Sequence, residues 1–281
     1  MRTHVHLVVA MFASVVCQAM AQPSPATPGT ASPGAATQDK PIPAATPSPP
    51  VAATPAPHTG TMQRHERFNA ISKEGKARLV FLGDSITQGW EGAGKAAWDE
   101  HFAPLGAANF GIGGDRTEHV LWRLDHGNFD GLSPALVVVM IGTNNAGARR
   151  DPPAETAAGI RAIVERLRAK CPASKILLLG IFPRGDKADD VFRRLNDEVN
   201  ALIAPIADGE RVFYKDIGAV FTDASGTPRK DLMPDWLHLS PEGYQRWAGA
   251  IKADVTRLMG EAGAPVPTPV PATGNSETAP R

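Results

Sequence analysis

Residues 78–85 read Arg78-Leu79-Val80-Phe81-Leu82-Gly83-Asp84-Ser85, an apolar run that ends in a turn-forming Gly-Asp-Ser triplet. A run of this length bounded by turn residues is typical of a strand with both faces buried, as in a parallel sheet covered by helices. Four further apolar runs have the same character, and they cover residues 107–110, 136–141, 176–179 and 212–214. The sequence therefore predicts five strands, the first of them at residues 79–82.

Amphipathic helical patterns separate these runs. They cover residues 117–126, 154–170 and 191–206, and each repeats apolar side chains every three or four positions. The side chains expected to face the core are Val120, Leu121, Leu124, Ile160, Ile163, Val164, Leu167, Leu195, Val199, Leu202 and Ile203. A last helix is expected after the N-cap Ser240, running to about residue 259. The alternation predicts an α/β fold, a doubly wound sheet of five parallel strands within a three-layer α/β/α sandwich.

The first 21 residues have the features of an export signal. Residues 7–16 are apolar or small and too few to span a bilayer as a helix, so no transmembrane segment is predicted. A small-x-small motif ending at Ala21 predicts cleavage there, with a mature N-terminus at Gln22 and an exported protein, periplasmic or secreted. The bulky residue before Cys17 argues against a lipid anchor.

Two Pro-rich segments flank the expected folded domain, which spans residues 62–260. Residues 22–61 and 261–281 contain too few large apolar side chains to build a core, and their prolines favour extended conformations. We interpret them as a disordered spacer and a disordered tail. Two roles remain open for them, a tether that holds the domain off a surface and a binding motif for another protein.

Charge and cysteine content exclude several kinds of protein. Lys plus Arg and Asp plus Glu are both 29, so the formal net charge is zero and no nucleic-acid partner is predicted. Cleavage of the signal removes Cys17 and leaves Cys171 alone, so we expect no intrachain disulfide. Cys171 ends a helical pattern without a histidine partner, which favours a structural thiol over a catalytic one.

Polar residues follow the strand-like runs where chemistry is expected. Ser85 and Asn144 each follow an apolar run, Gly114 closes a glycine cluster, and Asp235 and His238 precede the last helix. Because residues just past the carboxyl ends of parallel strands meet at one crevice, we expect these side chains to lie together. They supply a nucleophile (Ser85), a base (His238) and an orienting carboxylate (Asp235). The N–H groups of Ser85 and Gly114 and the Asn144 amide would hold an oxyanion, which completes a site for acyl transfer.

Each of these motifs, taken alone, also has a simpler interpretation. Gly83-Asp84-Ser85 is a common turn, and Thr87 replaces the second glycine of a nucleophile elbow. Asp235 and His238 are also suited to capping the last helix. The glycine cluster has Arg116 where a dinucleotide fingerprint needs its third glycine, and we find no Walker lysine, His-Glu-x-x-His or Cys/His cluster, so no metal or cofactor is predicted. The histidines interpreted as spacer, surface or packing residues are His58, His65, His101, His119 and His126.

Four sequence blocks resemble those of the SGNH (GDSL) hydrolase superfamily and occur in the same order. They are Gly83-Asp84-Ser85-Ile86, the glycine block ending at Gly114, Gly142-Thr143-Asn144-Asn145 and Asp235-Trp236-Leu237-His238. Residues 109–115, 119–124 and 183–185 are also similar to the catalytic subunits of platelet-activating-factor acetylhydrolase. The resemblance covers roughly residues 62–260. It implies a flavodoxin-like sheet and the same roles for Ser85, Asp235, His238, Gly114 and Asn144.

The resemblance also implies an acyl pocket walled by Ile86, Thr143 and Leu237, whose bulk suits a short acyl group such as acetyl. The expected function is an exported serine esterase that hydrolyses short-chain acyl esters through an acyl-enzyme intermediate. Alternatives are a lysophospholipase or thioesterase for longer chains and a non-catalytic carbohydrate-binding surface module. The expected substrate is an acyl ester of a small molecule, glycan or lipid, with the alcohol left open and a homodimer allowed.

Overall fold

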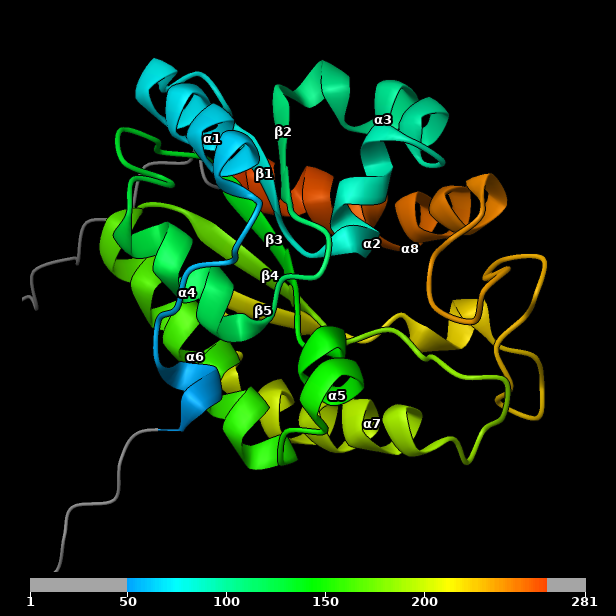
Figure 1. Ribbon diagram of the computed structural model, residues 1–281. Helices are drawn as coiled ribbons and strands as arrows, with labels where there is room; N and C mark the ends of the chain where they lie inside the picture. The colour runs from blue at the N-terminus through cyan, green and yellow to red at the C-terminus, as the bar shows by residue number, and fades with distance from the viewer. Residues whose placement is uncertain (1–49, 262–281) are drawn as a thin grey trace, which may run out of the picture. The chain divides into compact units, whose positions relative to one another are not determined.

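Five parallel strands form the sheet in the computed structural model, which describes residues 50–261 (Figure 1). In spatial order they are β2 (Ala107–Gly111), β1 (Leu79–Gly83), β3 (Leu136–Met140), β4 (Lys175–Leu179) and β5 (Val212–Lys215). This order is the flavodoxin-like one, with a switch point between β1 and β3. The predicted doubly wound fold is therefore confirmed, and each predicted strand is present with one end moved by a single residue.

Helices cover both faces of the sheet, which gives the predicted three layers (Figure 1). One face packs against α1 (Met62–Glu74), α4 (Thr117–Asp125), α6 (Pro153–Lys170) and α7 (Val191–Ile203). The other packs against α3 (Lys95–His101) and α8 (Pro241–Glu261). Two short helices, α2 (Ser85–Gln88) and α5 (Thr143–Arg149), follow the central strands β1 and β3 directly. These positions put the starts of α2 and α5 at the same edge of the sheet.

The pleat of each strand divides its side chains between two apolar cores. In β1, Val80 and Leu82 join the core under α1, α4 and α6, whereas Leu79 and Phe81 join the core under α3 and α8. This alternation is the period-two geometry of a strand, and all five residues of β1 and of β3 are buried. The near-continuous apolar runs of the sequence therefore reflect burial on both faces.

Aromatic side chains join α8 to the nucleophile end of β1. Trp90 lies 4.6 Å from Tyr244 and 4.8 Å from Trp247 between ring centroids, and all three rings are buried. The hydroxyl of Tyr244 donates a hydrogen bond of 2.6 Å to the carbonyl oxygen of Ile86. The last helix of the fold is thus fixed to the residue that follows Ser85.

Two sequence predictions are wrong in detail. Leu202 was expected in the core but is 44% exposed, because α7 turns Val199 and Ile203 inward and Leu202 lies beside that face. The spacer was expected to continue to residue 61, but residues 50–61 pack on the domain, and Ala52 in the short helix η1 (Val51–Ala53) is fully buried. We call residues 50–61 the N-terminal arm.

The export signal, the first part of the Pro-rich spacer and the Pro-rich tail lie outside the described residues. Within residues 50–261, no helix combines the length and the apolar character needed to cross a bilayer. Cys171 is a buried free thiol at the end of α6, as expected for a structural cysteine.

Candidate active site

Ser85 is the first residue of α2, immediately past the carboxyl end of β1. Asp84 is the N-cap of this helix, and its Oδ1 accepts a hydrogen bond of 3.0 Å from the backbone N–H of Ile86. The cap fixes the turn and leaves the Ser85 side chain partly exposed at the edge of the sheet.

A tight loop before α8 orients the histidine. Asp235 Oδ1 accepts backbone N–H bonds from Leu237 (3.1 Å) and His238 (2.7 Å), while its Oδ2 lies 2.7 Å from Nδ1 of His238. Trp236 has a left-handed φ of 62°, a conformation that non-glycine side chains adopt only under constraint. His238 Nε2 then lies 2.9 Å from Oγ of Ser85. The structure therefore brings the three predicted side chains into one hydrogen-bonded chain.

Burial and hydrogen bonding act in opposite directions on Asp235. Partial burial on its own raises the pKa of the carboxyl, but the hydrogen bonds from the side chain and backbone of His238 outweigh it, so the pKa lies below its ordinary value. The carboxylate is thus ionised over the neutral pH range. An ionised acceptor holds Nδ1 of His238 protonated and leaves Nε2 to accept the proton of Ser85.

The glycine loop that contains Gly114 lies next to Ser85, and Asn144 is bonded to that loop. Asn144, in the first turn of α5, donates from Nδ2 to the carbonyl oxygen of Asp115 at 2.9 Å, which ties it to the residue after Gly114. A Cβ placed on Gly113 would lie 3.8 Å from Cβ of Ser85, so this glycine loop runs next to the nucleophile. Among residues 50–261 no protein acceptor takes the N–H of Ser85 or Gly114. These groups are therefore free to bind an oxyanion.

Arg184 positions the start of α5. Its Nη1 donates to the carbonyl oxygen of Thr143 at 2.9 Å and to the Thr143 hydroxyl at 3.1 Å, one residue before Asn144. The residue lies in the 183–185 block on which the resemblance partly rested, but nothing in the sequence showed which residue it would contact.

A buried network beneath the glycine loop was not predicted. Asp115 is fully buried, and its Oδ2 accepts a hydrogen bond from Nε of the buried Arg123 (2.9 Å) and forms an ion pair with Nη2 of the same residue (2.8 Å). Its Oδ1 lies 2.8 Å from Nδ1 of His58, whose ring stacks on His119 with centroids 4.4 Å apart. The interpretation of His58 as a spacer residue is therefore wrong, whereas His119 is buried, as a packing residue would be.

His58, Asp115 and His119 are also the one cluster among residues 50–261 with the spacing of metal ligands, their ligand atoms lying within 4.8 Å of one another. The side chains present fit a hydrogen-bond network better. The Asp115 carboxylate is already paired with Arg123, and Nδ1 of His119 accepts the backbone N–H of Arg116 at 3.1 Å. Burial lowers the pKa of His119 to about 4, which suits a neutral, hydrogen-bonded imidazole.

The residues predicted to wall the acyl pocket serve packing in the structure. Ile86 is buried in the core under α8, Thr143 is buried and accepts the bond from Arg184, and Leu237 is partly buried against the same core as Ile86. Their role in binding an acyl group stays a prediction.

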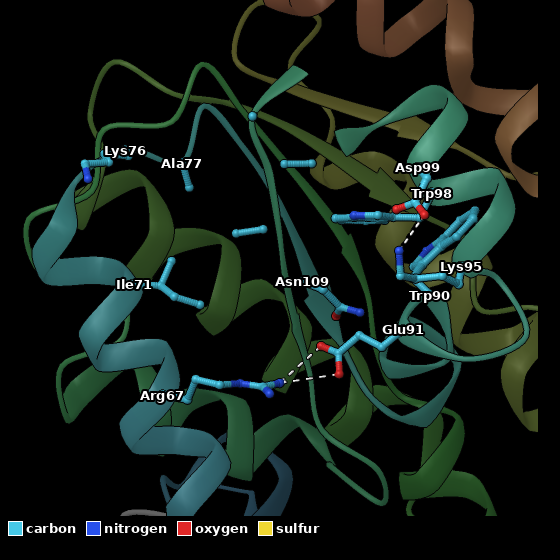
Figure 2. A pocket seen from close by; sticks show the side chains of 13 residues that line it. Arg67, Ile71, Lys76, Ala77, Trp90, Glu91, Lys95, Trp98, Asp99 and Asn109 are labelled. Carbon is cyan, nitrogen blue, oxygen red and sulfur yellow. Dashed lines mark hydrogen bonds and ion pairs between the residues drawn. The ribbon is translucent and has the colours of Figure 1, made fainter. Parts of the chain in front are cut away.

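A separate pocket of about 620 Å³ lies along the outer side of β2, between α1 and α3. Figure 2 shows Ile71 and Arg67 on one side and Trp98 on the other, with an ion pair between Arg67 and Glu91 that joins the two sides. None of the predicted site residues lines this pocket, so it is distinct from the hydrogen-bonded chain at Ser85.

Comparisons with known proteins agree with this geometry. Residues 81–246 match the GDSL-like lipase/acylhydrolase family. The chain is 39% identical over 215 residues to platelet-activating factor acetylhydrolase IB subunit alpha1 of Bos taurus, covering 75% of this chain and 90% of the relative. The alpha2 subunit of Gallus gallus is 36% identical over 201 residues, covering 71% and 85% respectively.

Solved structures share the fold at lower identity. A GDSL-like lipase from Bacteroides thetaiotaomicron superposes with a TM-score of 0.54 at 22% identity, over 69% of this chain and 97% of that one. An acetylxylan esterase from Geobacillus stearothermophilus superposes with a TM-score of 0.51 at 23% identity, over 65% and 93%. The family match contradicts the alternative of a non-catalytic binding module. The chain belongs to the GDSL-like lipase/acylhydrolase family and is a carboxylic ester hydrolase.

Proposed function

We propose that the protein is an exported serine esterase that removes short acyl groups, acetyl above all, through an acyl-enzyme intermediate. The observation that carries the proposal is the unbroken hydrogen-bonded chain from Asp235 through His238 to Ser85, with contacts of 2.7 Å and 2.9 Å. A hydroxyl becomes a nucleophile when a base accepts its proton, and this base is itself oriented by a carboxylate.

In the first step, Oγ of Ser85 attacks the ester carbonyl carbon while its proton moves to Nε2 of His238. The carbonyl electron pair moves onto oxygen, and this oxyanion is held by the N–H groups of Ser85 and Gly114 and the amide of Asn144. Donors fixed in place before the reaction act on charge that develops only in the transition state, so they raise the rate rather than the affinity.

In the second step, the bond to the alcohol oxygen breaks, and that oxygen takes the proton from His238 as the alcohol departs. The acyl group is then an ester of Ser85. A water molecule gives a proton to His238 and attacks the acyl carbon, after which the carboxylic acid leaves and Ser85 recovers its proton. Asp235 stays ionised throughout and stabilises the imidazolium that forms in each step.

The proposed preference for a short acyl group has two supports. Two of the three residues expected to wall the acyl pocket, Ile86 and Thr143, are buried, which favours a pocket with little room. The relatives named above differ in the alcohol that their names imply, yet acetylhydrolase and acetylxylan esterase share the acetyl group. The alcohol of this enzyme stays open between a sugar and a lipid. Export is proposed from residues 1–21, and a homodimer stays a prediction.

Replacing the nucleophile tests the mechanism. We expect Ser85→Ala to lower kcat for p-nitrophenyl acetate by at least about a thousandfold, because within residues 50–261 no other hydroxyl is hydrogen-bonded to His238. The matched control is Ser225→Ala, an exposed serine in a loop outside the site, which should leave kcat unchanged. Full turnover by a folded Ser85→Ala enzyme would exclude the mechanism.

A series of p-nitrophenyl esters from acetate to palmitate tests the acyl preference in the same assay. We expect kcat/KM to be highest for acetate and to fall as the chain lengthens. A maximum at long chains would replace the acetyl proposal with the lysophospholipase or thioesterase alternative while leaving the Ser85 mechanism intact.

A further inference from the structure

The N-terminal arm is bonded to α4 before His58 and closes a turn of its own after it. Before it, the carbonyl oxygen of Ala52 accepts the Thr117 hydroxyl at 2.7 Å, and the N–H of Ala56 donates to the carbonyl oxygen of Glu118 at 3.1 Å. After it, the Thr61 hydroxyl donates to the carbonyl oxygen of His58 at 2.8 Å. The imidazole is therefore presented from an anchored segment.

The His58 ring covers the glycine loop of the site. Its side chain is 24% exposed, and its Cε1 lies 3.2 Å from the position that a Cβ on Gly114 would occupy. Nδ1 is 2.8 Å from Oδ1 of Asp115. A carboxylate only accepts hydrogen bonds, so Nδ1 carries the proton and donates a hydrogen bond to Asp115.

Asp115 transmits this contact to the oxyanion donors. Arg123 occupies Oδ2 of its buried carboxylate and His58 occupies Oδ1, so both oxygens are paired. The backbone of the same residue follows Gly114 directly and accepts the Asn144 amide at 2.9 Å. Loss of His58 would remove the hydrogen-bond donor from a buried carboxylate oxygen, which is destabilising, and we expect the loop to shift in response.

We propose that His58 is a positioning residue for the reaction: through Asp115 it holds Gly114 and Asn144 where they meet the oxyanion. The inference rests on the proposed function, since it assigns a role to residues of that same site. Donors that are displaced by a fraction of an ångström lose much of their effect on the transition state but little on substrate binding.

Three substitutions of His58 separate this role from simple packing. The amide nitrogen of His58→Asn reaches the place of Nδ1, whereas that of His58→Gln reaches the place of Nε2. We expect kcat for p-nitrophenyl acetate to fall roughly tenfold in His58→Ala and His58→Gln, with KM within about twofold of wild type and most of kcat retained in His58→Asn. The control is His126→Ala, which removes an exposed histidine of α4's C-terminal end and should leave kcat unchanged.

A double-mutant cycle identifies the route of the effect. If His58 acts through Asn144 and its loop, then His58→Ala should slow an Asn144→Ala enzyme much less than it slows wild type. Melting temperatures of all variants show whether they fold. The comparison of His58→Asn with His58→Gln remains valid even if His58→Ala does not fold.

Three results would overturn the proposal: equal kcat in the Asn and Gln variants, a loss that appears in KM alone, or effects that add in the double mutant. Its failure is distinguishable from that of the proposed function. A Ser85→Ala enzyme that stays active rejects the serine mechanism whatever His58 does, and an inactive Ser85→Ala enzyme leaves the His58 comparison to decide the positioning role.

Discussion

Asp84, the residue before the nucleophile, is fully buried with a carboxyl oxygen, Oδ2, that has no hydrogen-bond partner among the described residues. Burial, with a smaller contribution from the charge of the nearby Asp115, raises the pKa of this carboxyl to about 7. The N–H of Ile86 and the charges of His238 and Arg184 act in the opposite direction without cancelling the shift. A group with this environment is protonated in mildly acidic solution and ionised above neutrality.

This shift predicts a pH-dependent stability. The folded-state pKa of Asp84 is higher than its ordinary value of 3.8. Its contribution to the free energy of unfolding is therefore fully present below about pH 4 and is lost as pH rises through about 7. We expect Asp84→Asn to be more stable relative to wild type at pH 8 than at pH 5, by at most about 3 kcal/mol, since the pKa of about 7 lies two units above pH 5 and one unit corresponds to about 1.4 kcal/mol.

Urea unfolding at both pH values measures this difference, with Asp186→Asn as a control because Asp186 is exposed. An identical pH dependence in wild type and Asp84→Asn would show that Asp84 does not titrate in this range. Other groups contribute equally to both proteins, so the comparison isolates this carboxyl.

The sequence indicated the residues that now share hydrogen bonds at the site, because each follows or precedes an element whose apolar pattern was clear. Ser85, Asn144 and His238 are examples, and their catalytic roles remain predictions. His58 could not be found in this way. It lies in a Pro-rich segment, and its partner Asp115 is 57 residues away, so only the folded chain brings the two together.

At the scale of elements, the N-terminal arm crosses α6 at a glycine. A Cβ on Gly159 would lie 2.3 Å from the carbonyl oxygen of Ala52 and 2.6 Å from the Thr117 hydroxyl. Contacts this short are impossible, and the nearer one involves backbone. The close approach of arm and helix therefore requires glycine at this position.

Gly159→Ala is expected to lift the arm from α6 and to lower the free energy of unfolding by about 1–3 kcal/mol, as overpacking does. The control is Gly249→Ala in α8, where a Cβ would have nothing within 4 Å and alanine should stabilise the helix by up to about 1 kcal/mol. Urea unfolding measures the free energy of unfolding of both variants. Hydrogen exchange of the Ala56 amide shows whether the arm remains bound. If Gly159→Ala stabilises as much as Gly249→Ala, the arm is not held there.

The helices that the sequence missed have weak apolar patterns. The buried residues of α1 are His65, Phe68 and Ser72, only one of them apolar, so no periodicity marks the helix. The helices α3 and α5 have seven residues each, too few for a repeat. By contrast, the inward residues predicted for α4 and α6 are all buried, because those helices present continuous apolar faces to the sheet.

For the whole molecule, the apolar runs predicted the strands and the alternation predicted the layers. The spatial order of strands depends on contacts between segments far apart in the chain, and it followed from the family resemblance rather than from any local pattern. The family match itself covers residues 81–246, whereas the fold extends from the N-terminal arm to the end of α8.

Processing of the full chain tests the export proposal. Expression with secretion should yield a mature protein that begins at Gln22, because small residues at Ala19 and Ala21 fit a signal-cleavage site. Ala21→Phe should block processing, whereas Ala26→Phe, beyond the site, should not. Mass spectrometry and N-terminal sequencing distinguish these products, and an intact residue 1 in the exported wild-type protein would contradict cleavage.

The pocket beside β2 has a consequence for how copies of this enzyme behave in a concentrated solution. β2 is an outermost strand, and the exposed backbone of such a strand is a template to which a strand of another molecule adds. The pairs Arg67–Glu91 and Lys95–Asp99 flank it with charge. The formal net charge of the chain is zero, so whole molecules do not repel one another strongly. Resistance to aggregation along this strand therefore depends on these two local ion pairs.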